Sequence, residues 1–259
     1  MHEATRKRRA LLWALTNCWV GQSWAQQAPP YSIDAATEEA RLSIGARDVT
    51  WWTNTVQLGA RLAPGSGWFV GAESQKRDRD TDVQANGGWY GKSGPWRWLG
   101  QASLAPGAAF LPRFGLLPQV GYVAGDYEVQ AGLVYKSFAA ARLRLATLGI
   151  VKYVGDSEYE LHLAHGTSTP LSRRIQVATL RAQVDLGGPW SYGASASAGR
   201  GLYDILNVPG VSGNSGWSAT LNARYRIGPA VSLRLDLGAG HENPDFHERR
   251  VGLSLRSAF

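Results

Sequence analysis

The sequence contains a single cysteine, Cys18, and no long apolar run after its first 25 residues. One cysteine cannot form a disulfide within the chain. Because Cys18 lies in a segment that we expect to be removed, thiolate and redox chemistry are excluded for the mature protein. A soluble domain of this size would need continuous apolar core segments. Here polar residues dilute the apolar ones almost throughout, which disfavours such a domain.

The excess of positive over negative charge is also small. The formal net charge is +7, of which residues 1–25 contribute +3 and leave +4 for the remainder. No run of Lys or Arg with interleaved aromatic residues follows residue 25, so we expect no nucleic-acid partner. The mean hydropathy of −0.23 would suggest a soluble protein. A membrane β-barrel gives the same value because its lipid-facing and lumen-facing residues alternate.

The carboxyl terminus shows this alternation most clearly. Val251, Leu253, Leu255 and Phe259 share one apolar face, and the positions between them are mostly small or charged. The pattern predicts a strand with one face toward lipid and the other toward water. We interpret Phe259 as an insertion signal for the barrel-assembly machinery, because bacterial outer-membrane barrels commonly end on an aromatic residue.

The amino terminus has the layout of a secretion signal. A basic segment over residues 6–9 precedes an apolar core over 10–20, and Ser23-Trp24-Ala25 places small residues before a cleavage site. The apolar core is far shorter than the ~20 residues of a membrane helix. We therefore predict a cleaved signal peptide over 1–25 and export through the Sec pathway. A lipoprotein signal at Cys18 is the alternative, disfavoured by the large, polar Asn17 before it.

Strand and turn signals alternate along the rest of the chain. After a flexible leader over residues 26–37, they predict one domain over 38–259, whose first hairpin pairs Glu39–Arg47 with Trp51–Leu62. We predict an all-β, antiparallel, up-and-down transmembrane β-barrel of about fourteen strands. Twelve is the alternative. Tight turns alternate with longer connections, as short periplasmic turns and longer outer loops require.

Aromatic residues cluster near the predicted turns. An amphipathic ring is stable at the level of the lipid headgroups, so this placement favours interfacial girdles. The alternative is that the rings fill the core of a soluble β-sandwich. The clustered residues are Trp51, Trp52, Trp68, Trp89, Trp96, Tyr153, Tyr159 and Trp190.

The faces opposite the apolar ones are expected to line the barrel lumen. Arg or Lys facing lipid at the midplane costs ~2–4 kcal/mol, so we assign the charged positions to the interior, fourteen basic and six acidic. This excess predicts a conduit that prefers anionic solutes. A salt-bridge network filling a closed barrel is the alternative. The lumen-lining residues predicted to set selectivity are Arg142, Arg144, Lys152, Arg181, Arg224, Arg226, Arg234 and Arg256.

Catalytic and metal sites are not evident, and we expect no cofactor. His162, with Ser168 nearby, is the candidate pair for an outer-membrane lipid hydrolase. The chain lacks the Gly-x-Ser-x-Gly motif of many hydrolases. His241 and His247 bracket a segment in which Pro244 forbids the helix of a zinc-protease motif, so we expect an exposed outer loop there.

Three segments in the middle of the chain carry a family resemblance. They are Leu111-Pro112-Arg113, residues 127–135 and residues 149–155, which place a Pro-Arg element before a hairpin and a Lys-Tyr-x-Gly turn. Together they resemble the YaiO family of outer-membrane β-barrels. The resemblance implies a barrel fold and an outer-membrane location. It carries no catalytic residue to this chain.

The expected function is therefore a passive conduit, or a barrel associated with envelope or exopolysaccharide export, in the outer membrane of a Gram-negative bacterium. Its expected partners are outer-membrane lipid and lipopolysaccharide, the barrel-assembly machinery, and anionic small solutes or polysaccharide. A lipid-modifying hydrolase and a structural barrel of a secretion complex are the alternatives.

Overall fold

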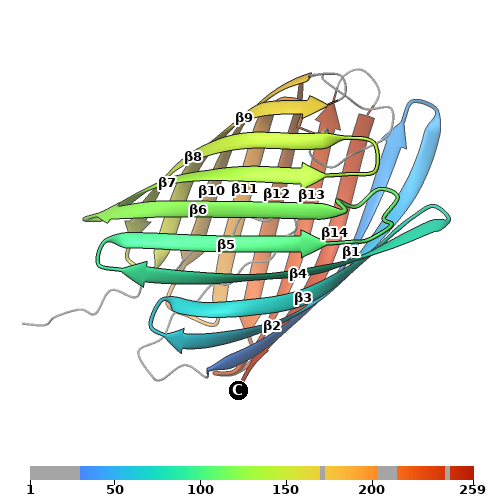
Figure 1. Ribbon diagram of the computed structural model, residues 1–259. Helices are drawn as coiled ribbons and strands as arrows, with labels where there is room; N and C mark the ends of the chain where they lie inside the picture. The colour runs from blue at the N-terminus through green and yellow to red at the C-terminus, as the bar shows by residue number, and fades with distance from the viewer. Residues whose placement is uncertain (1–29, 170–172, 203–214, 243–245) are drawn as a thin grey trace, which may run out of the picture.

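Fourteen antiparallel strands, joined in sequence order, close into one barrel (Figure 1). The computed structural model describes residues 30–169, 173–202, 215–242 and 246–259, so the predicted signal peptide lies outside the described residues. The predicted fold class and the larger of the two predicted strand numbers are confirmed. The strands are β1 (Tyr31–Ile44), β2 (Arg47–Ala63), β3 (Ser66–Arg77), β4 (Asp80–Ser93), β5 (Trp96–Leu104), β6 (Phe114–Ala124), β7 (Tyr127–Ser137), β8 (Arg142–Val154), β9 (Ser157–Thr169), β10 (Arg173–Asp185), β11 (Trp190–Arg200), β12 (Ser215–Arg226), β13 (Val231–Glu242) and β14 (Phe246–Ala258).

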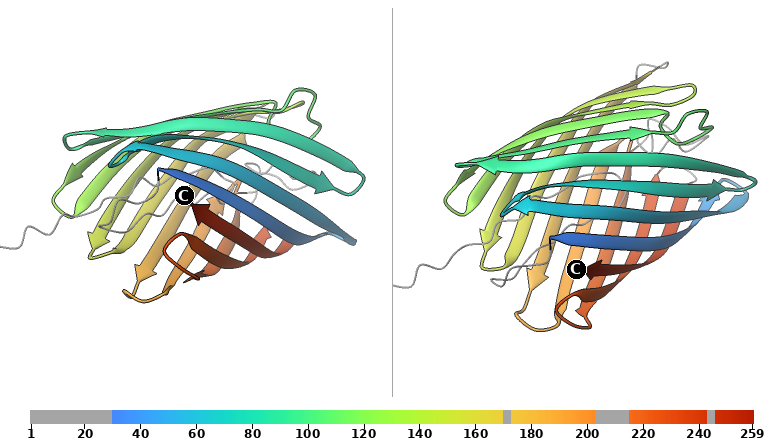
Figure 2. Two further views of the ribbon diagram at one scale, coloured as in Figure 1. Left: turned by 90° about the horizontal axis from the view of Figure 1, so that it is seen from below. Right: turned by 60° about the horizontal axis from the view of Figure 1, so that its bottom comes forward.

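Each strand pairs with its neighbours in sequence, and β1 pairs with β14 to close the ring (Figure 2). At this seam the backbone of Tyr31 exchanges two hydrogen bonds with that of Phe259, at N···O distances of 3.1 and 3.0 Å. Closure leaves no sheet edge, which is the condition for strands to lie in lipid. In the described part of the chain, no helix has the length and apolar character needed to cross a membrane.

The even strand number places β1's start and β14's end together, at what we call the terminus end of the barrel. The opposite end, which we call the loop end, carries the connection over residues 105–113, the longest that is fully described. Several terminus-end turns are two residues long, as at Gly125-Asp126 and Gly155-Asp156. Both glycines have φ near +60°, a conformation that glycine adopts at no steric cost in a tight turn.

Two sequence predictions about the amino-terminal region need correction. The flexible leader was expected to extend to residue 37, but β1 begins at Tyr31 and pairs with both β2 and β14. The first hairpin turn was expected after Arg47, whereas β1 ends at Ile44 and β2 begins at Arg47. The strand signal was missed because Ala35, Ala36 and Thr37 give weak alternation, and pairing on both sides overrides that local weakness.

The outward face carries an apolar band with an aromatic girdle at the terminus end. Trp96 lies against Tyr122 at a ring-centroid distance of 5.0 Å, and Trp190 lies against Tyr225 at 4.7 Å, each pair on neighbouring strands. The predicted girdle is present at this end, with three exceptions. Trp51 and Tyr153 point into the barrel, and Trp52 faces outward near the loop end. The terminus-end aromatics on the outward face are Tyr31, Trp68, Trp89, Trp96, Trp98, Tyr122, Tyr127, Tyr159, Trp190, Tyr192, Tyr225 and Phe259.

Glycines opposite these rings let the girdle lie flat on the sheet. Gly91 on β4 is the register partner of Trp98 on β5, and a Cβ at Gly91 would come within 2.0 Å of the Trp98 ring. Trp89 lies over Gly100 of the neighbouring strand in the same way. Part of the high glycine content therefore serves to seat aromatic rings across a strand pair.

The seam residue Phe259 yields a test of the predicted insertion signal. We expect Phe259→Ala to lower the amount of folded barrel assembled in cells, because the variant removes the terminal aromatic and its contact with Tyr31, at 6.1 Å between ring centroids. The loss of that aromatic pair is worth about 1 kcal/mol, so refolding in detergent should be much less affected. Heat-modifiable mobility on gels measures both quantities.

The matched control is Phe114→Ala, which removes an outward-facing phenylalanine at the loop end. Equal loss of assembly in both variants would mean that Phe259 acts only as one more lipid-facing ring. A selective loss for Phe259→Ala in cells supports its recognition during insertion.

Candidate functional site

The candidate site is the lumen, formed by the inward-facing positions of all fourteen strands. Among the residues predicted to line it, Arg181, Arg224, Arg226, Arg234 and Arg256 point inward, each next to at least one exposed apolar residue. Their orientation agrees with the alternation rule for strands. Whether they set selectivity stays a prediction.

Arg142, Arg144 and Lys152 point outward, contrary to the prediction. On β8 the inward positions are apolar near the loop end, with Leu143 and Leu145 almost fully buried. These leucines pack with Phe138, Ile175 and Val177 in an apolar cluster inside the barrel. The faces of β8 are therefore the reverse of those predicted. Its apolar residues near the loop end pack inside the barrel, and its cations lie on the exterior.

The charges inside the barrel are balanced, which corrects the predicted fourteen-to-six excess of basic residues. Over the described strands, buried or half-buried inward positions hold eleven cationic and eleven carboxylate side chains. The cations are Arg61, Arg77, Arg97, Lys136, Arg173, Arg181, Arg224, Arg226, Arg234, Arg250 and Arg256. The carboxylates are Asp34, Glu38, Glu73, Asp82, Glu128, Glu158, Glu160, Asp185, Asp236, Glu242 and Glu248.

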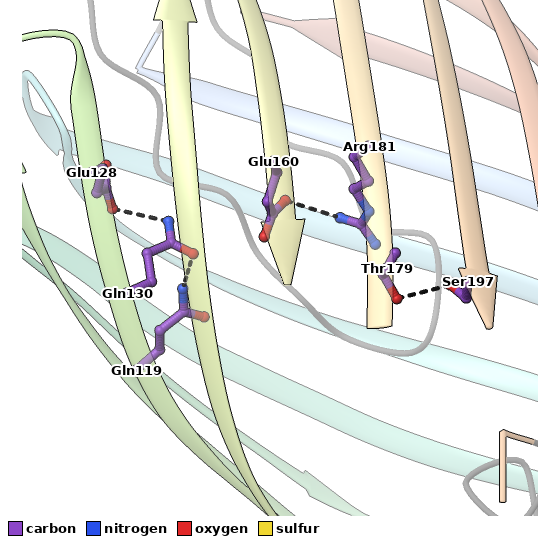
Figure 3. A network of polar contacts seen from close by, with 7 residues as sticks. All are labelled: Gln119, Glu128, Gln130, Glu160, Thr179, Arg181 and Ser197. Atoms are coloured by element: carbon purple, nitrogen blue, oxygen red, sulfur yellow. Dashed lines mark hydrogen bonds and ion pairs between the residues drawn. The ribbon is translucent and has the colours of Figure 1, made fainter. Parts of the chain in front are cut away.

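Many of these charges form ion pairs across or along the strands. Arg181 faces Glu160 at 3.9 Å between β10 and β9, as Figure 3 shows, and both side chains are largely buried. Arg226 faces Asp185 at 3.7 Å, and the guanidinium of Arg256 lies 3.8 Å from the Asp34 carboxylate. Arg234 also contacts Asp236. Ion pairs of the kind that the sequence alternative required are therefore present along the wall, and whether they fill a closed barrel stays a prediction.

The two signs are nevertheless unevenly distributed around the barrel. The inward charges of β7–β9 are Glu128, Glu158 and Glu160, with Lys136 as the cation among the described positions. The inward charges of β12–β14 include more cations than carboxylates. The cations there are Arg224, Arg226, Arg234, Arg250 and Arg256, and the carboxylates are Asp236, Glu242 and Glu248. A solute in the lumen thus meets sectors of different sign.

Amide side chains form the second polar component of the lumen. In the acidic sector, the amide of Gln119 donates to Gln130 at 2.8 Å, and that of Gln130 donates to Glu128 at 2.9 Å (Figure 3). Of the glutamines in the described strands, all except Gln176 face the lumen. The inward ones are Gln57, Gln75, Gln84, Gln101, Gln119, Gln130 and Gln183.

Two pockets open within this polar lining. One, of about 140 Å³, is lined mainly by β1, β2 and β12–β14 and includes Asp34, Arg224 and Arg250. The other, of about 100 Å³, lies against β3–β7 and includes Glu73 and Lys136. Gln75 and Arg77 line both pockets, so these two side chains lie between the two spaces.

The loop end of the lumen is narrowed by apolar side chains. Phe246, Leu42 and Trp51 form one cluster on the β14–β2 side, separate from the cluster around Leu143. Leu202, in the connection after β11, packs against both clusters. The Arg77 guanidinium lies over the Trp51 ring at 3.9 Å and over the Phe110 ring at 4.5 Å. The Leu202 contacts join distant parts of the wall across the loop end, whereas the Arg77 contacts link β3 to β2 and to the connection over residues 105–113.

The connection over residues 105–113 folds inward, and one carboxylate accepts three of the hydrogen bonds that hold it. Asp82 accepts hydrogen bonds from the backbone N–H groups of Ala109, Phe110 and Leu111, at 3.0, 2.8 and 2.8 Å. The amide of Gln84 donates to the carbonyl of Pro112 at 2.9 Å. Sequence reasoning missed this clamp, because nothing near Asp82 in the chain indicates that a loop 27 residues later folds back to it.

The hydrolase candidates are not brought together. His162 and Ser168 both face the lumen on β9, but six residues of extended strand separate them by about 20 Å. His165 faces outward, with its Nδ1 3.4 Å from the amide of Gln176. This arrangement does not provide the nucleophile–base contact that a Ser/His mechanism needs.

His241 and His247 lie in strands rather than in the expected loop. They are register partners on β13 and β14, with ring centroids 4.6 Å apart, and residues 243–245 between the strands lie outside the described residues. The backbone carbonyl of Phe246 lies 2.9 Å from Nδ1 of His241. Within the described ranges, no group of three His, Cys, Asp or Glu residues could hold a metal ion.

Comparison with known proteins identifies the architecture. No family model and no curated protein matches the sequence. Among solved structures, the chain is similar to a bacterial polysaccharide outer membrane secretin, with a TM-score of 0.59 and 9% identity over 90% of this chain and 99% of that one. It is also similar to OmpT of Vibrio cholerae, with a TM-score of 0.52 and 8% identity over 88% of this chain and 97% of that one. The KdgM porin gives a TM-score of 0.51 and 11% identity over 88% of this chain and 99% of that one. At these identities the likeness shows the outer-membrane β-barrel fold.

The Asp82 clamp makes a testable prediction about the width of the lumen. We expect Asp82→Ala to increase single-channel conductance in planar bilayers, because three backbone N–H groups lose a charged acceptor and residues 109–111 lose their tie to the wall. Each such hydrogen bond contributes about 2 kcal/mol.

The control is Asp80→Ala, which removes an exposed carboxylate from the same strand. Unchanged conductance in Asp82→Ala, with a folded barrel, would show that the inward loop does not limit the path.

Proposed function

We propose that the chain is an outer-membrane conduit of a Gram-negative bacterium for hydrophilic solutes, with saccharides as the favoured class. The observation that carries this proposal is the set of seven inward glutamine amides, six of them on β2–β7, interspersed with balanced charges beside two pockets. An amide offers both donors and acceptors, which suits sugar hydroxyl groups. A balanced lumen lacks the strong single-sign field that would favour ions of one charge over neutral solutes.

Buried polar groups in the wall support a hydrated interior. Arg97 is only 8% exposed, yet Nε and one terminal nitrogen of its guanidinium have no protein partner among the described residues. The side-chain oxygen of Gln101, on the same strand, is in the same situation. Leaving such groups dry would cost several kcal/mol for the guanidinium alone. Water or a polar solute therefore belongs in this part of the barrel.

The structural likeness supports the choice of saccharides, and the sequence resemblance supports the outer-membrane setting. One similar structure is a polysaccharide secretin, and the resemblance to the YaiO family suggests a barrel of the same envelope setting. We therefore favour saccharide passage over the anion-specific conduit, since the excess of lumen arginines on which anion preference depended is not present in the described strands.

The principal test uses the mature chain in planar bilayers under a salt gradient. We expect conductance steps with weak ion selectivity, and concentration-dependent block by neutral oligosaccharides. Arg224→Glu should shift the reversal potential toward cations, because Arg224 lines the larger pocket. Arg144→Glu is the matched control, since the same reversal is made on the outward face.

Absence of conductance from a folded, heat-modifiable barrel, including in the Asp82→Ala variant, would contradict the conduit. That result would favour a structural barrel in a secretion complex. Strong anion selectivity without sugar block would contradict the saccharide assignment alone.

A further inference from the structure

Four arginines lie close together on the outward face near the loop end, within the span of β8–β11. They are Arg142 and Arg144 on β8, Arg174 on β10 and Arg200 on β11, all exposed. Among the described residues, none of the four has a carboxylate partner, and no outward position of β8–β11 carries Asp or Glu. The patch is therefore an uncompensated concentration of positive charge.

The register brings two of these arginines to either side of one hydroxyl group. Thr167 on β9 is the cross-strand partner of both Arg144 and Arg174. Neighbouring strands lie ~4.8 Å apart, so the two arginine Cα atoms are separated by about 10 Å with Thr167 between them. Their guanidinium groups can converge above Thr167 on a single anion, to which the threonine hydroxyl can also donate.

The position of the patch along the strands identifies the setting of that anion. On the terminus-end side of the patch, the same outward faces carry Leu148, Ile150, Leu161, Leu163 and Leu180, which belong to the lipid-facing band. One or two outward positions, among them Ala146, His165 and Gln176, separate this band from the arginines, which precede the loops. This is the level of a lipid headgroup, and Arg recognises phosphate through two parallel N–H···O contacts.

We propose that this patch is a docking site for the phosphate groups of a phosphorylated glycolipid in the leaflet at the loop end. Such a lipid places its acyl chains on the apolar band and its phosphates over Arg144, Thr167 and Arg174, with Arg142 and Arg200 on the flanks. The site rests on the outer-membrane location in the proposed function, but it lies outside the lumen and does not depend on conduction.

The opposite end offers an internal comparison on the same strand. Lys152 is also exposed and outward-facing, but it lies at the terminus end with its ammonium group 5.7 Å from the centroid of the Tyr127 ring. No second outward cation of β8–β11 accompanies it among the described positions. A single cation cannot converge with another on one anion. Lys152→Gln is therefore a control that removes one outward positive charge from β8 outside the patch.

The experiment is a titration of the detergent-solubilised mature barrel with bisphosphorylated lipid A, followed by native mass spectrometry. We expect retained lipid on the wild type and on Lys152→Gln, and about tenfold weaker retention on the double variant Arg144→Gln/Arg174→Gln, since two charge-assisted contacts are lost. Dephosphorylated lipid A and inorganic pyrophosphate are the two comparison probes. Weak binding of both supports a site that needs phosphate and acyl chains together.

Equal retention by the double variant and the wild type would overturn the proposal, as would equal retention of dephosphorylated lipid A. Binding of pyrophosphate as tight as that of lipid A would show a free-phosphate site instead. Conductance measured on the same samples separates the two hypotheses. A silent barrel that still binds lipid A in this pattern contradicts only the conduit, and a conducting barrel without phosphate-dependent binding contradicts only the docking site.

Discussion

Pairing of backbone hydrogen-bonding groups in the absence of water is the constraint on which the rest of this structure depends. In lipid, every N–H and C=O group must find a partner within the protein, and a sheet achieves this only by closing on itself. The Tyr31–Phe259 backbone pair and the long β1–β14 register complete that closure. Once the ring is closed, each side chain must face either lipid or lumen. That binary choice determines where chemistry can be placed.

The choice was predictable where one face meets lipid and the other meets water. Alternation along β12–β14 assigns Arg224, Arg234 and Arg256 to the interior, and the structure agrees. Alternation defines two faces but not which one points inward. On β8, Leu143 and Arg144 could occupy either environment, and the outcome is decided by Phe138, Ile175 and Leu202, which the chain brings from other elements. Such tertiary contacts leave no local pattern in the sequence.

The charge balance of the lumen was missed for the same reason. Carboxylates such as Glu242 and Glu248 lie next to histidines and arginines whose orientation the sequence does not reveal, and both are buried in the barrel wall. The Asp82 clamp depends on a loop that returns to a distant strand. The number of strands and the aromatic girdle follow from short-range regularities, whereas the width and polarity of the lumen follow from how distant segments pack inside it.

The apolar closure at the loop end has a thermodynamic consequence. Leu202 joins two clusters that are otherwise held on separate parts of the wall, so widening this end transfers leucine, phenylalanine and tryptophan surface into lumen water. Exposure of apolar surface raises the heat capacity. The free-energy difference between such a widened state and the narrow one should then vary with temperature along a curve, and excluded salts such as sulfate should favour the narrow state. A closure built from ion pairs would instead loosen as salt screens the charges.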